Sequence, residues 1–169
     1  EWIVDIDLEK FFDKIPQDRM MAILGKTIKD KKVLRLIGNM LRSGTLMPDG
    51  IVEASNEGAT QGSPLSPLLS NVVLDELDKE LEKRQLKFCR YADDANIFCR
   101  SEKAAKRVME NVTKFIENKM KLKVNKEKSK TSKSDKVQFL GITIIVTITA
   151  FVAIAKKSME KANEAIKRL

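Results

Sequence analysis

The chain has 169 residues, 43% of them hydrophobic, a formal net charge of +8 and no histidine. This length and apolar content fit one domain with a sizeable core, and a net positive charge of this size favours a polyanionic partner. The absence of histidine excludes hydrolysis by a histidine-based triad and most zinc catalysis.

The two cysteines, Cys89 and Cys99, flank an Asp93-Asp94 pair and could face each other across a hairpin. One pair in a chain of this length is not a disulfide framework, so we expect reduced, strand-packed thiols in a cytosolic protein. The N-terminus shows no secretory signal pattern. It lacks Met and starts on a functional-looking strand, so we expect a fragment of a longer protein.

Residues Trp2 to Leu8 alternate as a strand does, which places Asp5 and Asp7 on one face. Pro16 is a natural first-turn residue for the helix that follows. Two helical stripes come next, and we interpret both as core packing: Met20, Met21, Leu24 and Ile28 in the first, and Val33, Leu34, Ile37, Met40 and Leu41 in the second, which ends near Gly44.

Thr45 to Glu53 predicts a hairpin around Pro48-Asp49-Gly50. The loop from Ser55 to Ser66 is rich in Gly and Pro and leads into a helix that Ser66 can cap, with Pro67 at its first position. Apolar residues recur along this helix at i+4 spacing, and we expect its charged face to be solvated: the apolar set is Leu69, Val73, Leu77 and Leu81.

The segment from Phe88 to Arg100 predicts a hairpin with its turn at Asp93-Asp94. Asp is a common turn residue, so the simplest interpretation is a solvated hairpin tip. However, no Gly follows the acids, and the acidic first strand needs a partner. If the two strands pair, Asp7 and Asp93 converge, and converging carboxylates repel each other unless a cation lies between them.

The last third of the chain begins with a helix that Ser101 caps, with Ala105, Val108, Met109, Val112, Phe115 and Ile116 inward. Seven lysines between Lys121 and Lys136 form either a solvated loop or a phosphate-contacting segment. Val137 to Ile144 predicts a strand with a bulge at Gly141. The 14-residue run from Ile142 to Ala155 is too short for a transmembrane helix and predicts one or two buried strands.

Ser158 to Leu169 closes the chain as a basic amphipathic helix. Strands joined by hairpins and mixed with paired helices predict an α+β fold, an antiparallel sheet with helices packed on one face.

Three motifs in order carry a family resemblance: Asp7-Leu-Glu-Lys-Phe-Phe-Asp13, Gln61-Gly-Ser-Pro-Leu-Ser-Pro67 and Tyr91-Ala-Asp-Asp94. Together they resemble the palm of a reverse transcriptase, in the variant found in bacterial group II intron-encoded reverse transcriptases and maturases. Leu122 to Ser129 and Phe139-Leu140-Gly141 agree with the same family. One departure is Thr60, which stands where the family usually has Pro.

The resemblance implies that Asp7 and Asp93 bind two magnesium ions, that Asp94 assists, and that the Leu8 carbonyl completes the metal shell. Manganese could substitute. Asp5 shares a strand face with Asp7, but the family places an aromatic gate five positions after the metal ligand, as Phe12 follows Asp7. Asp supplies the hard oxygen ligands that magnesium prefers.

The remaining implied roles concern substrates. Phe12 would lie under the sugar of the incoming nucleotide and exclude a 2′-hydroxyl, Gln61 would contact the nucleotide or template, and Lys128 would lie near the triphosphate. Phe139, Leu140 and Gly141 would belong to the turn that grips the primer end.

For the whole chain, the resemblance implies a palm over residues 1–148 and a connection into the thumb over 149–169, with the fingers absent. The expected partners are an RNA template, a DNA primer, a dNTP and, in the parent protein, an intron RNA, in a bacterial cytoplasm and without a membrane. Without fingers and thumb, we expect weak primer–template binding and a fragment that need not be active.

Several alternatives stay open. One is an RNA-binding maturase in which polymerisation is secondary or lost. Another is an RNA-dependent RNA polymerase, which the bulky Phe12 disfavours. Retron, diversity-generating and CRISPR-associated reverse transcriptases share much of this palm and are not excluded.

Overall fold

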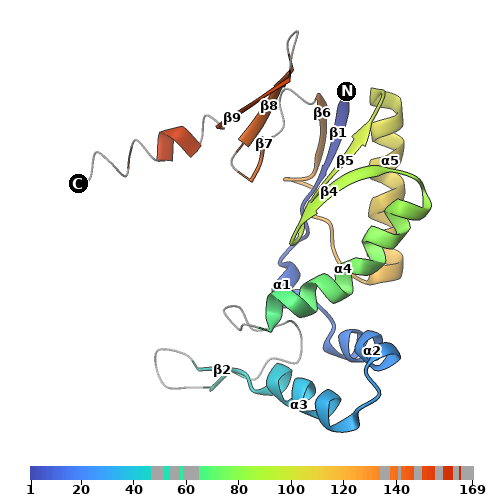
Figure 1. Cartoon of the computed structure of the whole chain (residues 1–169), viewed down its shortest axis with the longest axis vertical. Helices are drawn as coiled ribbons and strands as arrows, with labels where there is room; N and C mark the ends of the chain where they lie inside the picture. The colour runs from blue at the N-terminus through green and yellow to red at the C-terminus, as the bar shows by residue number, and fades with distance from the viewer. Residues whose placement is uncertain are drawn as a thin grey trace.

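A four-stranded antiparallel sheet lies at the centre of the molecule (Figure 1). The computed structural model describes residues 1–46, 52–53, 58, 65–133, 138–140, 142–146, 150–154, 158–161 and 164. The strand order is β4-β5-β1-β6, and the strands are β1 (Trp2–Ile6), β4 (Lys87–Tyr91), β5 (Asp94–Cys99) and β6 (Lys130–Lys133). The N-terminal strand therefore occupies an interior position between two strands from much later in the sequence.

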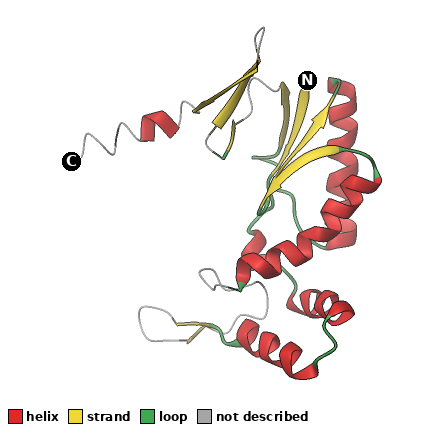
Figure 2. Ribbon diagram, viewed as in Figure 1, coloured by secondary structure: helices red, strands yellow, loops and turns green. Residues whose placement is uncertain are grey.

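Helices pack on one face of this sheet (Figure 2). Their bounds are α1 (Phe11–Lys14), α2 (Gln17–Thr27), α3 (Lys31–Arg42), α4 (Ser66–Lys83), α5 (Glu102–Phe115) and a π-helical continuation, η1 (Ile116–Met120). Helix α5 contacts β1, β5 and β6, helix α4 contacts β4, and α2 packs against both α3 and α4. The prediction of an α+β fold with helices on one face is confirmed.

The two faces of the sheet differ in chemistry because side chains alternate along each strand. Val4 lies opposite Ile97, and Ile6 lies opposite Ala95; all four are buried in the core beneath the helices. The other face carries Asp5, which lies opposite Asn96 on β5 and opposite Lys130 on β6. The apolar face anchors the sheet to the helices, and the polar face is where the acidic residues of β1 and β5 come together.

Smaller sheets complete the described structure. Strand β2 (Thr45–Leu46) pairs with β3 (Val52–Glu53), which confirms the predicted hairpin, although its turn at 48–50 lies outside the described residues. Strands β7 (Gln138–Phe139), β8 (Ile142–Val146) and β9 (Ala150–Ile154) form an antiparallel three-stranded sheet. In Figure 1 this sheet lies on the β6 side of the central one. The boundary predicted at residue 148 falls between β8 and β9 and stays a prediction.

Three predictions about the strands need correction. Val137 to Ile144 is not one bulged strand, because β7 and β8 pair with each other and Leu140 between them has φ 50°. The run from Ile142 to Ala155 does form two strands, β8 and β9, as predicted. Ile142, however, is exposed and not buried. The cysteines do not face each other, since Cys89 lies opposite Asn96. Both thiols are free; Cys99 is buried, which raises its pKa, whereas Cys89 is exposed.

The helices also depart from the predictions in part. Leu41 is buried in α3, but Val33 and Met40 are more than two-fifths exposed, so this stripe is only partly core. Helix α4 begins at Ser66 after Leu65, one residue before the predicted start, and no side chain caps it. Its buried stripe of Leu69, Val73, Leu77 and Leu81 and the Ser101 cap of α5 are confirmed.

The closing segment is helical at 158–161 and at 164, as predicted, and its other residues lie outside the described part. Across the residues that the structure describes, no helix combines the length and the apolarity needed to cross a membrane.

Candidate active site

The acidic residues meet where β1 and β5 end side by side. The sequence made the convergence of Asp7 and Asp93 conditional on the pairing of these strands. They do pair, antiparallel, from Trp2 opposite Cys99 to Ile6 opposite Ala95. Asp7 follows Ile6 and Asp94 precedes Ala95, so the backbone register brings these two residues to the same end of the pair. The hairpin turn is formed by Ala92 and Asp93, one residue earlier than predicted, because Asp94 already pairs with Tyr91 as the first residue of β5.

Burial, and to a smaller extent repulsion by neighbouring carboxylates, raises the pKa of two of these residues, Asp94 and Asp5. Burial raises the pKa of Asp94, and the charges of Asp93 and Asp7 raise it further, while Lys128 opposes the shift. Burial likewise raises the pKa of Asp5, against the attraction of Lys130, and Asp94 and Asp7 add to it. Four aspartates thus share one negative field at the end of the sheet, and a cation there would relieve it.

The backbone of Asp7 is held by the segment that precedes β6. The Asp7 amide donates to Ser129 Oγ at 3.0 Å, and the Asn125 amide donates to the Asp7 carbonyl oxygen at 2.9 Å. The Ser129 hydroxyl also donates to that carbonyl oxygen, at 3.3 Å. Leu8 forms an antiparallel bridge with Val124. This support was not predicted from sequence, although Asn125 and Ser129 belong to one of the recognised motifs.

Within the described residues, Lys128 is the residue that forms an ion pair with the Asp7 carboxylate. Its ammonium lies 3.5 Å from Asp7 Oδ2, and its side chain is 68% exposed. At this distance and exposure the pair contributes little to stability. Lys128 is therefore free to exchange its carboxylate contact for another anion in the same place.

Arg90 fixes the turn that presents Asp93. Its guanidinium donates two hydrogen bonds to the Asp78 carboxylate of α4, at 2.8 and 2.6 Å. Nη1 donates to the Ala92 carbonyl oxygen and to Asn71 Oδ1, both at 2.9 Å. Ala92 has φ 52°, a left-handed conformation that costs free energy for a residue with a Cβ. The charged face of α4 was predicted to be merely solvated; instead it anchors this turn.

Phe12 borders a hollow beside that turn. Phe12 is half-buried, and its ring meets that of Phe11 edge-on at a centroid distance of 5.4 Å. The hollow has a volume of about 540 Å³ and is lined by Phe12, Pro67, Ser70, Asn71, Arg90, Tyr91 and Ala92. An aromatic face, hydrogen-bonding groups and space of this size suit a small polar ligand with a planar ring or a sugar.

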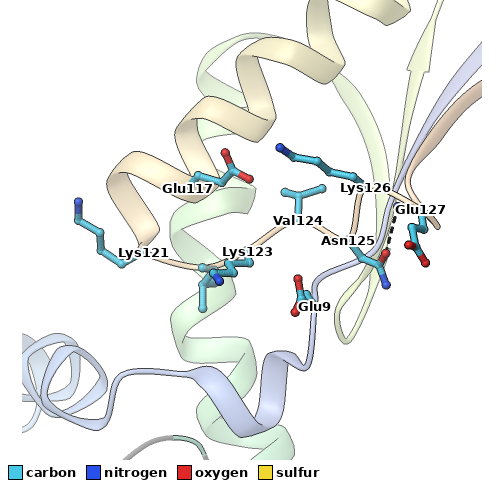
Figure 3. Close-up of a pocket in the computed structure, with 9 residues that line it drawn as sticks. Glu9, Glu117, Lys121, Lys123, Val124, Asn125, Lys126 and Glu127 are labelled. Atoms are coloured by element: carbon cyan, nitrogen blue, oxygen red, sulfur yellow. Dashed lines mark hydrogen bonds between the residues drawn. The ribbon is translucent and has the colours of Figure 1, made fainter.

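A second hollow lies behind the bridge between Leu8 and Val124, and Figure 3 shows the side chains around it. It is lined by Glu9, Glu117, Lys121, Leu122, Lys123, Val124, Asn125, Lys126 and Glu127. The acidic and basic side chains are mixed here, and none of the clustered aspartates lines it. The described lysines of the 121–136 run are exposed, so both interpretations of this run stay open.

Of the remaining predicted site residues, the structure describes Phe139 and Leu140. Phe139 is half-buried and Leu140 is 54% exposed at the tip of the β7–β8 hairpin. Gln61 and Gly141 lie outside the described residues. Within the described ranges, no group of three or more acidic or cysteine side chains is drawn close enough to hold a metal ion. The carboxylate oxygens are nevertheless the donors that magnesium prefers.

Comparison with known proteins decides the family. A family model described as "Reverse transcriptase (RNA-dependent DNA polymerase)" matches residues 1–144. The chain belongs to the reverse transcriptase family. This confirms the resemblance drawn from the three motifs.

Two relatives refine the comparison. Protein YkfC of Escherichia coli (strain K12) is 27% identical over 85% of this chain, which covers 47% of YkfC. The group II intron-encoded protein LtrA of Lactococcus lactis subsp. cremoris is 36% identical over 53% of the chain, which covers 15% of LtrA. The chain thus spans about half the length of the first relative and a much smaller part of the second.

Among solved structures, apo telomerase from Candida tropicalis truncated from its C-terminal domain superposes with a TM-score of 0.71. The two are 16% identical, over 90% of this chain and 35% of the telomerase. At this identity the likeness shows the fold alone, and it supports the α+β architecture.

Proposed function

We propose that this chain is the palm of an RNA-directed DNA polymerase that adds dNTPs to the 3′-hydroxyl of a primer, and that its parent is a group II intron-encoded protein. Membership of the reverse transcriptase family supports the reaction class. Similarity to LtrA supports the intron origin. The observation that carries the proposal is the acidic end of the β1–β5 pair, because clustered carboxylates with raised pKa values weaken a fold unless they serve a cation.

In this proposal, Asp7, Asp93, Asp94 and the Leu8 carbonyl hold two magnesium ions, which manganese can replace. When bound, the ions supply Lewis-acid activation of the primer 3′-oxygen and neutralise charge on the leaving pyrophosphate. The chain's own contribution is positioning. Ser129 and Asn125 fix the backbone of Asp7, while Arg90 fixes the turn that carries Asp93.

The substrates occupy the surroundings of this site. The hollow beside Phe12 accepts the nucleotide sugar, and the Phe12 ring excludes a 2′-hydroxyl. Lys128 exchanges Asp7 for the triphosphate, and Gln61 contacts the nucleotide or the template. Phe139, Leu140 and Gly141 hold the primer end. RNA template, DNA primer and intron RNA are the polyanions that the net charge of +8 suits.

The experiment that tests the proposal is primer extension on an RNA template with magnesium or manganese, comparing the wild type with Asp93→Asn. Extension by the wild type and its loss in the variant are expected, because one carboxylate of the metal site becomes a neutral amide. If the protein binds primer–template but the wild type and Asp93→Asn extend it equally, Asp93 does not serve catalysis.

The alternative function is an RNA-binding maturase in which polymerisation is secondary or lost. The similarity to LtrA, a group II intron-encoded protein, supports this alternative. Intron RNA binding by the wild type and Asp93→Asn distinguishes the two functions when it is measured beside extension. Unchanged RNA binding with no wild-type extension supports the maturase.

A further inference from the structure

Gln17 is a buried polar residue to which none of the family motifs assigns a role. It is the first residue of α2, directly after Pro16, and is 8% exposed. Its side-chain amide nitrogen donates two hydrogen bonds to carbonyl oxygens from distant parts of the chain. One goes to Leu41 at 3.2 Å and the other to Gly58 at 3.1 Å.

These two carbonyl groups belong to different elements. Leu41 lies in the last turn of α3, where carbonyl oxygens have no partner within the helix. Gly58 stands three positions before Gln61 in the sequence. Because the amide is buried, losing it would leave two buried carbonyl oxygens without this donor, which costs more than losing an exposed hydrogen bond.

Gly58 is also fixed to the segment that carries Phe12. Its amide donates to the Ile15 carbonyl oxygen at 2.7 Å. It has φ +81°, and a Cβ at this position would lie 2.6 Å from the Phe12 carbonyl oxygen and 2.7 Å from that of Asp13. Only glycine permits so close an approach of two backbones. Gly58 is therefore packed directly on the backbone of Phe12.

Phe12 connects this contact to the proposed nucleotide site. Gly58 packs on the backbone of Phe12, whose side chain borders the hollow proposed for the nucleotide sugar. We propose that Gln17 is a positioning residue of the nucleotide pocket: it holds Gly58 against the segment that carries Phe12. This inference rests on the proposed function and deepens it.

The test compares Gln17→Met, which keeps the side-chain length and removes both N–H donors, with Val112→Ala. Val112 is buried in α5, away from this contact, and its truncation controls for a general loss of stability. Two quantities are measured in each protein: hydrogen exchange of the Gly58 amide, and binding of a dNTP with magnesium to the complex with a dideoxy-terminated primer on an RNA template.

In Gln17→Met the Gly58 amide should exchange faster, and the Kd for dNTP should rise about tenfold while the Kd for primer–template stays within about twofold. Val112→Ala should leave the Gly58 exchange and the dNTP Kd close to those of the wild type. An unchanged Gly58 exchange rate, an equal loss of dNTP affinity in the control, or a parallel loss of primer–template affinity would overturn the assignment.

The dideoxy primer separates this inference from the proposed function. A wild type that binds dNTP yet extends no ordinary primer disproves the polymerase proposal, and the Kd comparison still decides the role of Gln17. A wild type that binds no dNTP to its primer–template complex disproves both.

Discussion

Arg90 of β4 and Asp78 of α4 form a two-pronged ion pair, with Nε and Nη2 of the guanidinium each donating to a separate carboxylate oxygen at 2.8 and 2.6 Å. The same guanidinium reaches the Ala92 carbonyl oxygen. One side chain therefore ties the helix-covered face of the sheet to the turn that presents Asp93. The position of Asp93, a proposed metal ligand, therefore depends on a contact on the helix-covered face of the sheet, which is opposite its acidic face.

Replacing Arg90 with Lys tests this connection. Lys keeps the charge but cannot form the two-pronged contact, and Arg90 and Asp78 are only 12% and 24% exposed. We expect a loss of about 1–3 kcal/mol in the free energy of unfolding, measured by urea denaturation, because hydrogen bonds to charged groups contribute this much. Primer extension should fall as the turn loosens.

Arg84→Lys is the matched control, since Arg84 pairs with Glu80 on the surface of α4. Its change in stability should be within about 0.5 kcal/mol. Equal losses of unfolding free energy in the two variants would show that the contacts of Arg90 with Asp78 and Ala92 stabilise the fold no more than the Arg84–Glu80 pair does.

Phe12→Ala should raise ribonucleotide incorporation relative to deoxyribonucleotide incorporation. The ring borders the proposed sugar pocket, and its removal makes space for a 2′-hydroxyl. The measurement is the ratio of kcat/KM for a dNTP and its matching rNTP. Tyr91→Phe is a suitable control, because Tyr91 lines the same hollow and keeps its ring. An unaltered ratio in Phe12→Ala would remove Phe12 from the role of a steric gate.

Lys128→Met should raise the KM for dNTP with little effect on stability. The side chain is 68% exposed, and its 3.5 Å pair with Asp7 is worth at most about 1 kcal/mol. Lys126 lies in the same run, is exposed and lines the hollow behind the Leu8 bridge, so Lys126→Met controls for the loss of one positive charge. If both variants raise the KM equally, the effect is one of overall charge and not of contact with the triphosphate.

Stability should fall as pH rises through the titration of Asp5. Its pKa in the folded protein is raised above 3.8 by burial and by Asp94 and Asp7, against Lys130. The folded state therefore binds this proton more tightly than the unfolded state does, and the free energy of unfolding decreases with pH from about 3.8 upward until the raised pKa is passed.

In metal-free buffer, Asp5→Asn should consequently be more stable than the wild type at neutral pH, and this difference should shrink toward the acid end of the window. Thermal unfolding across a pH series measures it. Asp13→Asn, an exposed residue of α1, controls for the loss of one negative charge. A variant that is less stable than the wild type at neutral pH would show that repulsion at Asp5 is outweighed by contacts of its carboxylate.

The local patterns of the sequence predicted much of this fold because alternation and helical periodicity state which side of an element is apolar. They marked β1 and β5 as strands and identified the buried stripe of α4, but left the pairing of β1 with β5 as a condition. They do not state whether another element covers an apolar side, which is why Val33 and Met40 of α3 were wrongly assigned to the core. Likewise, a strong turn residue such as Asp93 does not fix the register of a hairpin to one residue.

The motifs proposed the aspartates as metal ligands, but the contacts that fix the Asp93 turn and Gly58 could not be read from the sequence. Arg90 reaches Asp78 twelve positions earlier, and Gln17 reaches Gly58 across 41 positions. Neither spacing repeats within a helix or strand, so no local pattern marks it. Such contacts exist only once the sheet and its helices have assembled.

Manganese binding, followed by electron paramagnetic resonance in the complex with dideoxy-terminated primer, RNA template and dNTP, shows directly whether the acidic end of the sheet holds the metal ions. We expect tight manganese binding by the wild type and a loss of at least about tenfold in affinity in both Asp7→Asn and Asp93→Asn, because each change replaces a charged oxygen ligand. Glu9→Gln, an exposed acid two residues from Asp7, should bind as the wild type does. Equal manganese affinity in all four proteins would contradict the assignment of the acidic end of the sheet as the metal site.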